Sequence, residues 1–262
     1  MESIKKFAKW LLDIGEGNVG GDNDGDAIIE IPEDLLINDV SDPIQKRAIL
    51  SHKNEVVHDI NDHLLALFPG EEKEYLSSDS ICQTEQTLDP FQESLYSTEN
   101  LNALKISGLH NHRLVLKFGV PVMLLRNIDQ KNDLCNGTRL QITFLGKRVI
   151  EAEVISGENI GSRVFIPRIN MIPSDKKNPF SISTQTISLS VCFAMTINKS
   201  QGQSLSRVGL YLKDPVFTHS QLYVALSRVK TRDGVKILIF DDEGKPTNQT
   251  ANIVYKEIFG NL

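Results

Sequence analysis

A polar stretch at Asn198–Ser204 carries side chains that suit the binding of a phosphate. It follows directly on the apolar run Val191–Ile197 and contains no aliphatic side chain. Lys199 offers a positive charge, the serines and glutamines offer neutral hydrogen bonds, and Gly202 lets a ligand approach the backbone closely. The preceding run is too continuous for a half-exposed strand, so we predict a buried strand of a parallel sheet. Because α/β sheets bind ligands at the carboxyl ends of their strands, Asn198–Ser204 is a candidate ligand loop.

Arg228 is a second candidate for phosphate chemistry. It lies in the last turn of a helix predicted over His219–Val229, in which Leu222, Ala225 and Leu226 share one apolar face. Burial of that face would fix the backbone of Arg228 and leave its guanidinium free to stabilise charge on a transferring phosphate. The alternative for both Arg228 and Lys199 is a solvated surface charge, because isolated Lys and Arg side chains are mostly exposed.

The elements around these residues predict an α/β core. Val208–Leu212 and Val235–Phe240 have the composition of buried strands, and Arg47–Ser51 has the same pattern earlier in the chain. A helix is predicted over Glu55–Leu67, with Val56, Ile60, Leu64 and Leu67 on its apolar face. Alternating strands and helices of this kind favour a RecA-like α/β architecture.

A different pattern occupies the middle of the chain, from Leu104 to about Ser174. Short β-rich segments are separated there by Gly, Asn and Asp turns, and Asn136-Gly137 favours a tight turn. The predicted strands are Val120–Arg126, Thr138–Phe144, Val149–Ile155 and Arg163–Ile166. A small barrel is the natural way for so few strands to hide their edges.

Several of these stretches resemble motifs of the PIF-type DNA helicases of superfamily one. Phe193–Ser204 resembles motif V, Gln221–Val229 resembles motif VI, and Arg47–Asn61 resembles motif IV with its helix. Leu116–Asn127 together with Cys135–Leu140 is similar to the family's SH3-like 2B insert. The nearest similarity is to the plant and Helitron-associated branch.

The sequence departs from the family pattern at three places. Asn198 stands where many members have His, and Ser204 stands where Thr is usual. Ser183–Ser188 replaces a run of the type Arg-Arg-Gln-Phe-Pro, so two cations and an aromatic side chain are missing from that connector. DNA contacts from the connector are therefore in doubt.

The resemblance implies an α/β fold, a second RecA-like motor domain with an inserted SH3-like β-barrel. It divides the chain into a remnant of the first motor domain with an acidic linker (1–40), the first part of the second motor domain (41–103), the 2B insert (104–175) and the second part of the motor domain (176–262). The chain would then correspond to the carboxyl-terminal half of a family member.

The resemblance also implies roles for single residues. Arg228 would be the catalytic arginine finger and, with Gln201 and Gly202, would contact nucleotide. The residues implied to contact single-stranded DNA are Thr196, Asn198, Lys199, Ser200, Lys117 and Arg139. No metal ligands are expected in this chain.

Intact relatives couple ATP hydrolysis, with Mg²⁺, to 5′→3′ movement on single-stranded DNA in DNA repair, recombination, replication and telomere maintenance. This chain has no Gly-x-x-x-x-Gly-Lys-Ser/Thr stretch and no Walker B acid upstream of its motifs, so we expect it to bind no nucleotide tightly and to lack ATPase activity alone. A separately encoded first motor domain is a possible partner. The alternatives are a non-catalytic single-stranded nucleic-acid-binding module and a degenerate transposon-derived product.

The charge distribution fits a nucleic-acid partner only in the second part of the chain. The formal net charge is −6, but residues 1–100 hold 7 Lys+Arg against 22 Asp+Glu, whereas residues 101–262 hold 21 against 12. Only the latter could attract a phosphate backbone. No apolar run reaches the roughly 20 residues of a membrane helix, no signal peptide is visible, and the three cysteines show no metal or disulfide spacing. A nuclear location is expected, with mitochondria as the alternative.

Overall fold

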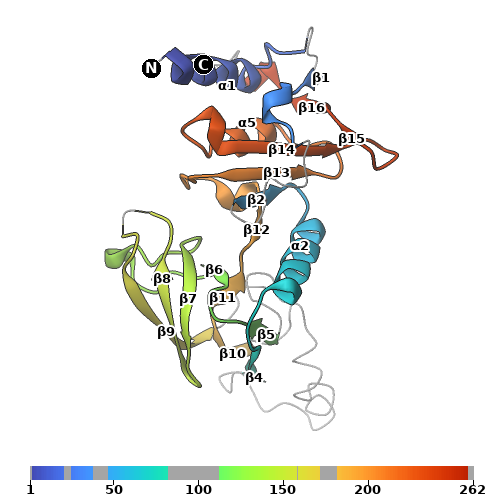
Figure 1. The fold of residues 1–262 in the computed structure, drawn as a ribbon. Coiled ribbons are helices and arrows are strands. Elements are labelled where there is room, and N and C mark those ends of the chain that lie inside the picture. Colours follow the sequence, from blue (N-terminus) through green and yellow to red (C-terminus); the bar gives the residue numbers. More distant parts are fainter. Residues whose placement is uncertain are drawn as a thin grey trace. The chain divides into compact units, whose positions relative to one another are not determined.

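The computed structural model describes residues 2–20, 25–37, 47–81, 112–157, 159–171 and 182–258 (Figure 1). The chain forms two compact units. Unit 1 combines Met1–His63 with Phe193–Leu262, and unit 2 is Leu64–Cys192. Unit 2 is thus inserted into the sequence of unit 1 and is longer than the expected insert over 104–175. The three expected domain boundaries, after residues 40, 103 and 175, lie outside the described residues.

Unit 1 is built on a five-stranded, mostly parallel sheet, whose strands lie side by side in Figure 1. Its order is β12-β2-β13-β14-β15; the first four strands run parallel, and β15 pairs antiparallel with β14. The strands are β12 (Ala194–Thr196), β2 (Ala48–Ser51), β13 (Val208–Leu212), β14 (Val235–Phe240) and β15 (Pro246–Thr247). All four residues of the interior strand β2, which lies between β12 and β13, are buried, as expected for a parallel sheet covered on both faces.

Helices and a short ribbon complete unit 1. Helix α1 (Glu2–Gly15) packs against α5 (Gln221–Leu226), and β1 (Asp26–Glu30) pairs antiparallel with β16 (Gln249–Ile253). The side-chain amide of Asn252 donates to the carbonyl oxygen of Ile14 at 2.9 Å and so ties the ribbon to α1. The described residues of this unit also form the 3₁₀ turns η1 (Glu33–Leu35), η4 (Asn198–Ser200), η5 (Arg232–Gly234) and η6 (Lys256–Ile258).

Helix α2 (Asn54–Leu67) confirms the predicted helix but buries a different face. Its buried residues are Val57 and Asn61, whereas Leu67, assigned to the apolar face, is 64% exposed. Asn61 donates to the carbonyl oxygen of Ala194 at 2.9 Å and accepts from the Ala194 N–H at 2.8 Å. A single amide side chain therefore satisfies both backbone groups on the open edge of β12.

The apolar run Val191–Ile197 is not a single strand, and this prediction was wrong in its extent. Its first residue ends β11 (Leu189–Val191), which pairs with β6 (Pro121–Leu124) in unit 2. After Cys192 and Phe193 the chain enters β12 of unit 1. Both segments are apolar because each contributes to the interior of its own sheet.

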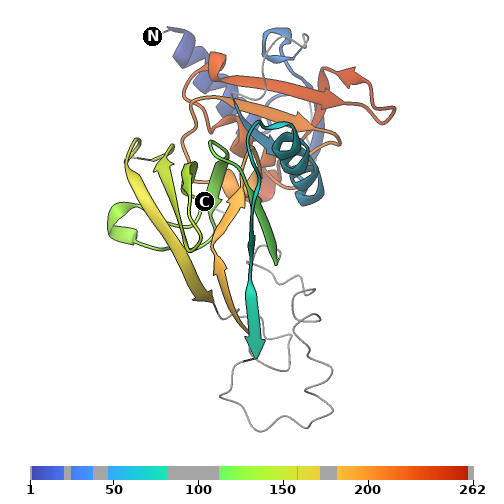
Figure 2. The ribbon, with the colours of Figure 1, turned by 60° about the horizontal axis from the view of Figure 1, so that its bottom comes forward.

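Unit 2 contains the predicted barrel. Its antiparallel sheet has the order β11-β6-β7-β8-β9-β10-β4. Strands β10 and β11 are consecutive, with only Ser188 between them. Strand β10 pairs with β9 and β11 pairs with β6, and these two partners lie at opposite ends of the row β6-β7-β8-β9. This bent stretch therefore closes the sheet into a barrel (Figure 2). The stretch expected to be a connector, Pro179–Ser190, therefore supplies barrel strands in its described part. The other elements of unit 2 in its described residues are β3 (Lys73–Leu76), β4 (Ser78–Ile81), β5 (Arg113–Leu116), η3 (Gln130–Asn132), β7 (Arg139–Leu145), β8 (Val149–Val154), β9 (Arg163–Met171) and β10 (Ile182–Ile187).

Candidate functional site

The loop after β12 lies at the carboxyl edge of the parallel sheet in unit 1. Thr196 and Ser51, the last residues of β12 and β2, are register partners, and the Ile197 N–H donates to the Ser51 carbonyl oxygen at 2.9 Å. The chain then forms η4 and turns at Gly202, whose φ is +76°. A Cβ atom at Gly202 would meet nothing within 4 Å, so the turn is open to a ligand.

Two of the expected DNA-contacting side chains serve the loop itself. Ser200 is fully buried, and its hydroxyl donates to the Ile197 carbonyl oxygen at 2.6 Å. Thr196 is 7% exposed, and its Oγ1 accepts from the Lys199 N–H at 3.3 Å. Asn198 and Lys199 have exposed side chains. The loop therefore presents an amide and an ammonium group to solvent on a backbone that its own hydroxyls brace.

Arg228 follows α5 and points back to this loop. Its Nη1 donates to the carbonyl oxygens of Ser200 at 3.3 Å and Gln203 at 3.4 Å. Helix α5 is six residues long, shorter than the predicted His219–Val229. Its buried Leu222, Ala225 and Leu226 nevertheless fix the backbone that carries Arg228, as predicted. The guanidinium, which was predicted to be free, is instead hydrogen bonded to the loop and to the end of α5, because their carbonyl and hydroxyl oxygens lie within its reach. The structure thus brings Arg228 together with Gln201, Gly202 and the residues of the loop.

The sequence analysis did not identify a neighbouring group of side chains at the end of β2, which includes His52 and Lys53. His52 is 6% exposed and packs edge-on against Phe217, with 5.6 Å between ring centroids. Beside it, Lys53 Nζ lies 2.6 Å from Asp214 Oδ2 in a partly exposed ion pair. The signal was present, because His52 and Lys53 directly follow the buried strand β2, much as Asn198 follows β12 after Ile197.

Burial and charge both act on His52. Desolvation, and then the charge of Lys53, lower the pKa of its imidazole, while Asp214 offsets part of the effect. Within the part of the chain that the structure describes, neither ring nitrogen has a hydrogen-bond partner. His52 is therefore held neutral next to the exposed cations of this edge.

The two expected DNA contacts in unit 2 take part in internal interactions. The side chain of Lys117 is 6% exposed; its Nζ donates to the Phe68 carbonyl oxygen at 2.8 Å and lies 3.4 Å from Glu72 Oε1. This places a cation at the carboxyl end of α2, where it interacts favourably with the helix dipole. Arg139 is half-buried and donates from Nη2 to the Cys192 carbonyl oxygen at 3.2 Å. Burial of this kind favours a structural role for Lys117, and DNA contact by either residue stays a prediction.

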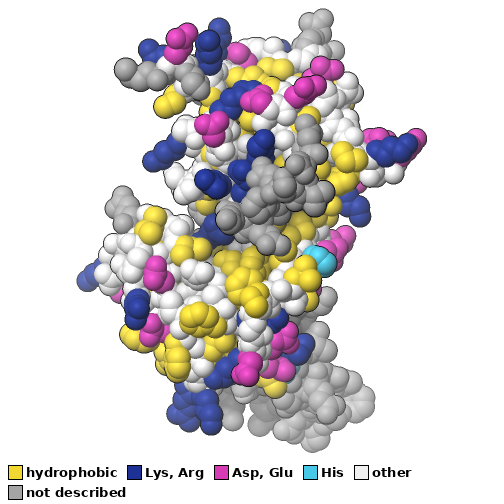
Figure 3. Space-filling model, viewed as in Figure 1, with side chains coloured by type: hydrophobic (Ala, Val, Ile, Leu, Met, Phe, Trp, Pro, Cys, Tyr) yellow, Lys and Arg dark blue, Asp and Glu magenta, His cyan; other side chains and the backbone are white. Residues whose placement is uncertain are grey.

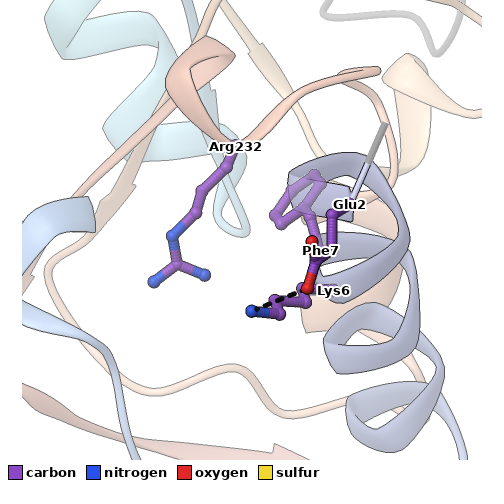
Figure 4. Close-up of a pocket in the computed structure, with 4 residues that line it drawn as sticks. All are labelled: Glu2, Lys6, Phe7 and Arg232. Atoms are coloured by element: carbon purple, nitrogen blue, oxygen red, sulfur yellow. Dashed lines mark ion pairs between the residues drawn. The ribbon is translucent and has the colours of Figure 1, made fainter.

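A hollow of about 380 Å³ in unit 1 lies away from these residues. Figure 4 shows Arg232 on one side of it and Glu2, Lys6 and Phe7 of α1 on the other. Its charges are compensated: Arg232 makes a two-pronged contact with Asp34 at 2.6 and 2.8 Å, and Lys6 pairs with Glu2 at 3.6 Å. The hydrogen bond from Arg232 also lowers the pKa of Asp34. The hollow is therefore not the candidate site.

Neither a metal centre nor a membrane span is found in the described ranges. They contain no group of three or more His, Cys, Asp or Glu side chains that could hold a metal ion. No described helix has the length and apolar character needed to cross a bilayer. The site contains one guanidinium, that of Arg228, and one open glycine turn, at Gly202. These groups could contact one side of a phosphate group but could not surround it.

Comparisons with known proteins agree with this arrangement. The family model "DNA helicase Pif1, 2B domain" matches residues 99–145. ATP-dependent DNA helicase PIF1 of Danio rerio is 28% identical over 222 residues, which cover 83% of this chain and 31% of that relative. The chain thus spans about a third of the relative's length.

Solved structures of Pif1 helicases share the fold. The Pif1 helicase from Candida albicans superposes with a TM-score of 0.65 at 21% identity, over 98% of this chain and 57% of that one. The Pif1 helicase from Bacteroides in complex with ADP-AlF3 and ssDNA gives a TM-score of 0.59 at 19% identity, over 97% of this chain and 52% of that one. The fold is that of a RecA-like α/β motor with a 2B domain, and the Pif1 helicase family is supported.

Proposed function

We propose that this chain supplies the second motor domain and the 2B domain of a Pif1-type DNA helicase, one that moves 5′→3′ on single-stranded DNA at the expense of ATP. The observation that carries the proposal is the contact of Arg228 with the loop Asn198–Ser204 at the carboxyl edge of a parallel sheet. It supports the proposal because Arg228, proposed to reach a phosphate, and the loop, proposed to contact DNA, belong to one structural unit. The plant and Helitron-like branch and a nuclear location belong to the same proposal.

On the nucleotide side, the chain would contribute Arg228 as the arginine finger and Gln201-Gly202 as a turn near the phosphates. Bound ATP and Mg²⁺ would supply the transferable phosphoryl group and neutralise its charge. The groups that cradle the β- and γ-phosphates would come from a first motor domain, on the same longer protein or on a separate chain. We therefore propose that this chain alone does not hydrolyse ATP.

On the DNA side, the exposed Asn198 and Lys199 would contact the phosphate backbone. The Bacteroides Pif1 helicase of the same fold was crystallised with ssDNA, which supports DNA binding as such. Lys and Arg side chains are interspersed with acidic ones over the face seen in Figure 3, so we expect weak binding that depends strongly on salt.

The DNA side is tested by fluorescence anisotropy with a labelled single-stranded oligonucleotide at several salt concentrations. We expect affinity to fall steeply with salt, and Lys199→Ala to reduce the slope of log affinity against log salt by about 1. Lys245→Ala, an exposed lysine paired with Glu243 in a surface turn, is the matched control and should leave the slope unchanged. Absence of binding at low salt would refute the DNA-binding part of the proposal.

The nucleotide side is tested by fusing the amino-terminal motor domain of a relative to this chain. DNA-stimulated ATPase should appear in the fusion but not in the chain alone. Arg228→Lys should reduce it by about 10³-fold or more, because a point charge does not reproduce the planar fork of a guanidinium. Full turnover in the Lys variant would exclude a finger role. A chain that binds DNA but gives an inactive fusion would instead be a nucleic-acid-binding module without catalysis.

A further inference from the structure

All three nitrogens of the Arg228 guanidinium donate hydrogen bonds to groups of its own unit. Nε donates to the Val224 carbonyl oxygen at 2.8 Å, and Nη2 donates to Ser227 Oγ at 2.9 Å. Nη1 is shared between the carbonyl oxygens of Ser200 and Gln203. The proposed finger thus makes four hydrogen bonds, to the loop Asn198–Ser204 and to the end of α5.

The main chain of Arg228 holds the same loop at its far end. The Leu205 N–H donates to the Arg228 carbonyl oxygen at 2.8 Å, and the Leu205 side chain is buried. Between η4 and Leu205 the loop has little other support from packing: Gln201, Gly202 and Ser204 are exposed. Arg228 therefore holds two carbonyl groups of the loop and the amide of Leu205, the residue directly after it.

We propose that Arg228 is a positioning residue for the loop Asn198–Ser204, and that it releases the loop when its guanidinium turns to a phosphate. The two tasks exclude one another, because Nη1 and Nη2 would form the fork that a phosphate accepts. With Arg228 on the loop, Asn198 and Lys199 are presented on a fixed backbone. With Arg228 on a phosphate, the carbonyl oxygens of Ser200 and Gln203 lose their charged donor.

The DNA consequence of this inference rests on the proposed function; the loop consequence does not. If DNA requires the fixed loop, DNA and nucleotide compete for Arg228. By linkage, each then weakens the other's equilibrium affinity by the same factor. Arg228 would in this way transmit the nucleotide state to the DNA-binding loop within a single structural unit.

Hydrogen exchange of the full chain without ligand tests the positioning role. In Arg228→Ala we expect the amides of Gln203 and Leu205 to exchange about tenfold faster, because a charged donor to their loop is lost. Arg228→Lys, which can reach one carbonyl at a time, should give an intermediate rate. Lys230→Ala, an exposed lysine two residues further on, removes the same charge and should leave the loop unchanged. Unchanged loop exchange in Arg228→Ala would overturn the proposal.

Single-stranded DNA affinity gives a second readout that separates positioning from direct contact. Arg228→Ala should weaken binding several-fold with an unchanged salt slope, whereas loss of a phosphate contact lowers the slope by about 1. A lowered slope would mean that the guanidinium touches DNA and would also overturn the proposal. If the unmodified chain binds no DNA, the proposed function fails while loop exchange still decides the inference. If Arg228→Ala does not fold, the Lys variant decides in its place.

Discussion

At the scale of single residues, the carboxyl edge of the sheet in unit 1 combines groups of opposite character. Arg228 is charged and donates hydrogen bonds from all three of its nitrogens, while His52 is buried beside the exposed Lys53, and burial lowers its pKa. A neutral imidazole in such a place adds no positive charge to the edge, but it makes the fold sensitive to protonation.

The stability of the protein should therefore fall as the pH decreases from about 8 to about 5.5. The folded state lowers the pKa of His52 below its usual 6.5, so in this range the unfolded chain binds more protons than the folded one. The free energy of unfolding therefore decreases as the pH falls. Urea unfolding across this range should show the effect. It should be smaller in His52→Leu and unaltered in His58→Ala, an exposed histidine of α2.

The carboxylates act in a lower range, so they do not confuse this measurement. Arg232 and Lys53 hold the pKa values of Asp34 and Asp214 below 3.8, and their contributions are lost only as the pH falls below about 4. A pH dependence equal in the native chain and in His52→Leu would show that His52 is not its source.

Ser220 predicts a stabilising substitution. It precedes α5 with φ +56° and ψ +12°, a left-handed conformation that costs free energy for a residue with a Cβ atom. Ser220→Gly should raise the free energy of unfolding by about 0.5–1 kcal/mol, net of the greater entropy of glycine in the unfolded chain. Thermal and urea unfolding would measure the gain. Ser220→Ala keeps the Cβ atom and loses the hydroxyl, so it should give no gain.

At the scale of elements, the sequence was a good guide to which segments are buried and a poor one to their partners. The strands of unit 1 and the barrel strands follow from apolar runs and turns. The division of Val191–Ile197 between two sheets does not, because hydrophobicity reports burial and not the neighbour that provides it. In the same way, the i, i+4 pattern of α2 pointed to Ile60 and Leu64, but the polar Asn61 is buried because β12 is an edge strand with unpaired backbone groups.

The candidate site, too, could be predicted from the sequence only in part. Motif resemblance brought the loop and Arg228 together, but it could not show that Ser200 is buried or that Lys117 closes the carboxyl end of α2. Those facts depend on where side chains point, which spacing along the chain does not determine.

Asn61 should be among the most sensitive positions in unit 1. Asn61→Ala removes two buried hydrogen bonds and leaves the Ala194 N–H and carbonyl without their partner, so we expect a loss of about 2–4 kcal/mol in the free energy of unfolding. Urea unfolding measures it, with His58→Ala on the solvent side of the same helix as control. A loss below about 0.5 kcal/mol would mean that water replaces the amide at little cost.

At the scale of the whole molecule, the chain is one unit interrupted by another. Every described candidate residue that contacts or forms the loop belongs to unit 1, while Lys117 and Arg139 belong to unit 2. The chain enters unit 2 near the end of α2 and leaves it between β11 and β12. The motif IV segment and the motif V loop are therefore brought together only by folding.

This interruption determines an order of folding. In unit 1, β2 must pair with β12, and Asn61 must contact Ala194, which is 133 positions further along the sequence. In the barrel, by contrast, each of the strands β6 to β9 pairs with the next strand of the sequence. Because closing a long loop costs entropy before its contacts form, the barrel should form first and shorten the loop that unit 1 has to close. Pulse-labelled hydrogen exchange during refolding should show protection in β7 and β8 before β2 and β12, and simultaneous protection would contradict this order. During synthesis, β2 would then remain unpaired with β12 until the ribosome has completed all of unit 2, and the edge on which Arg228 and the loop meet could form only after that.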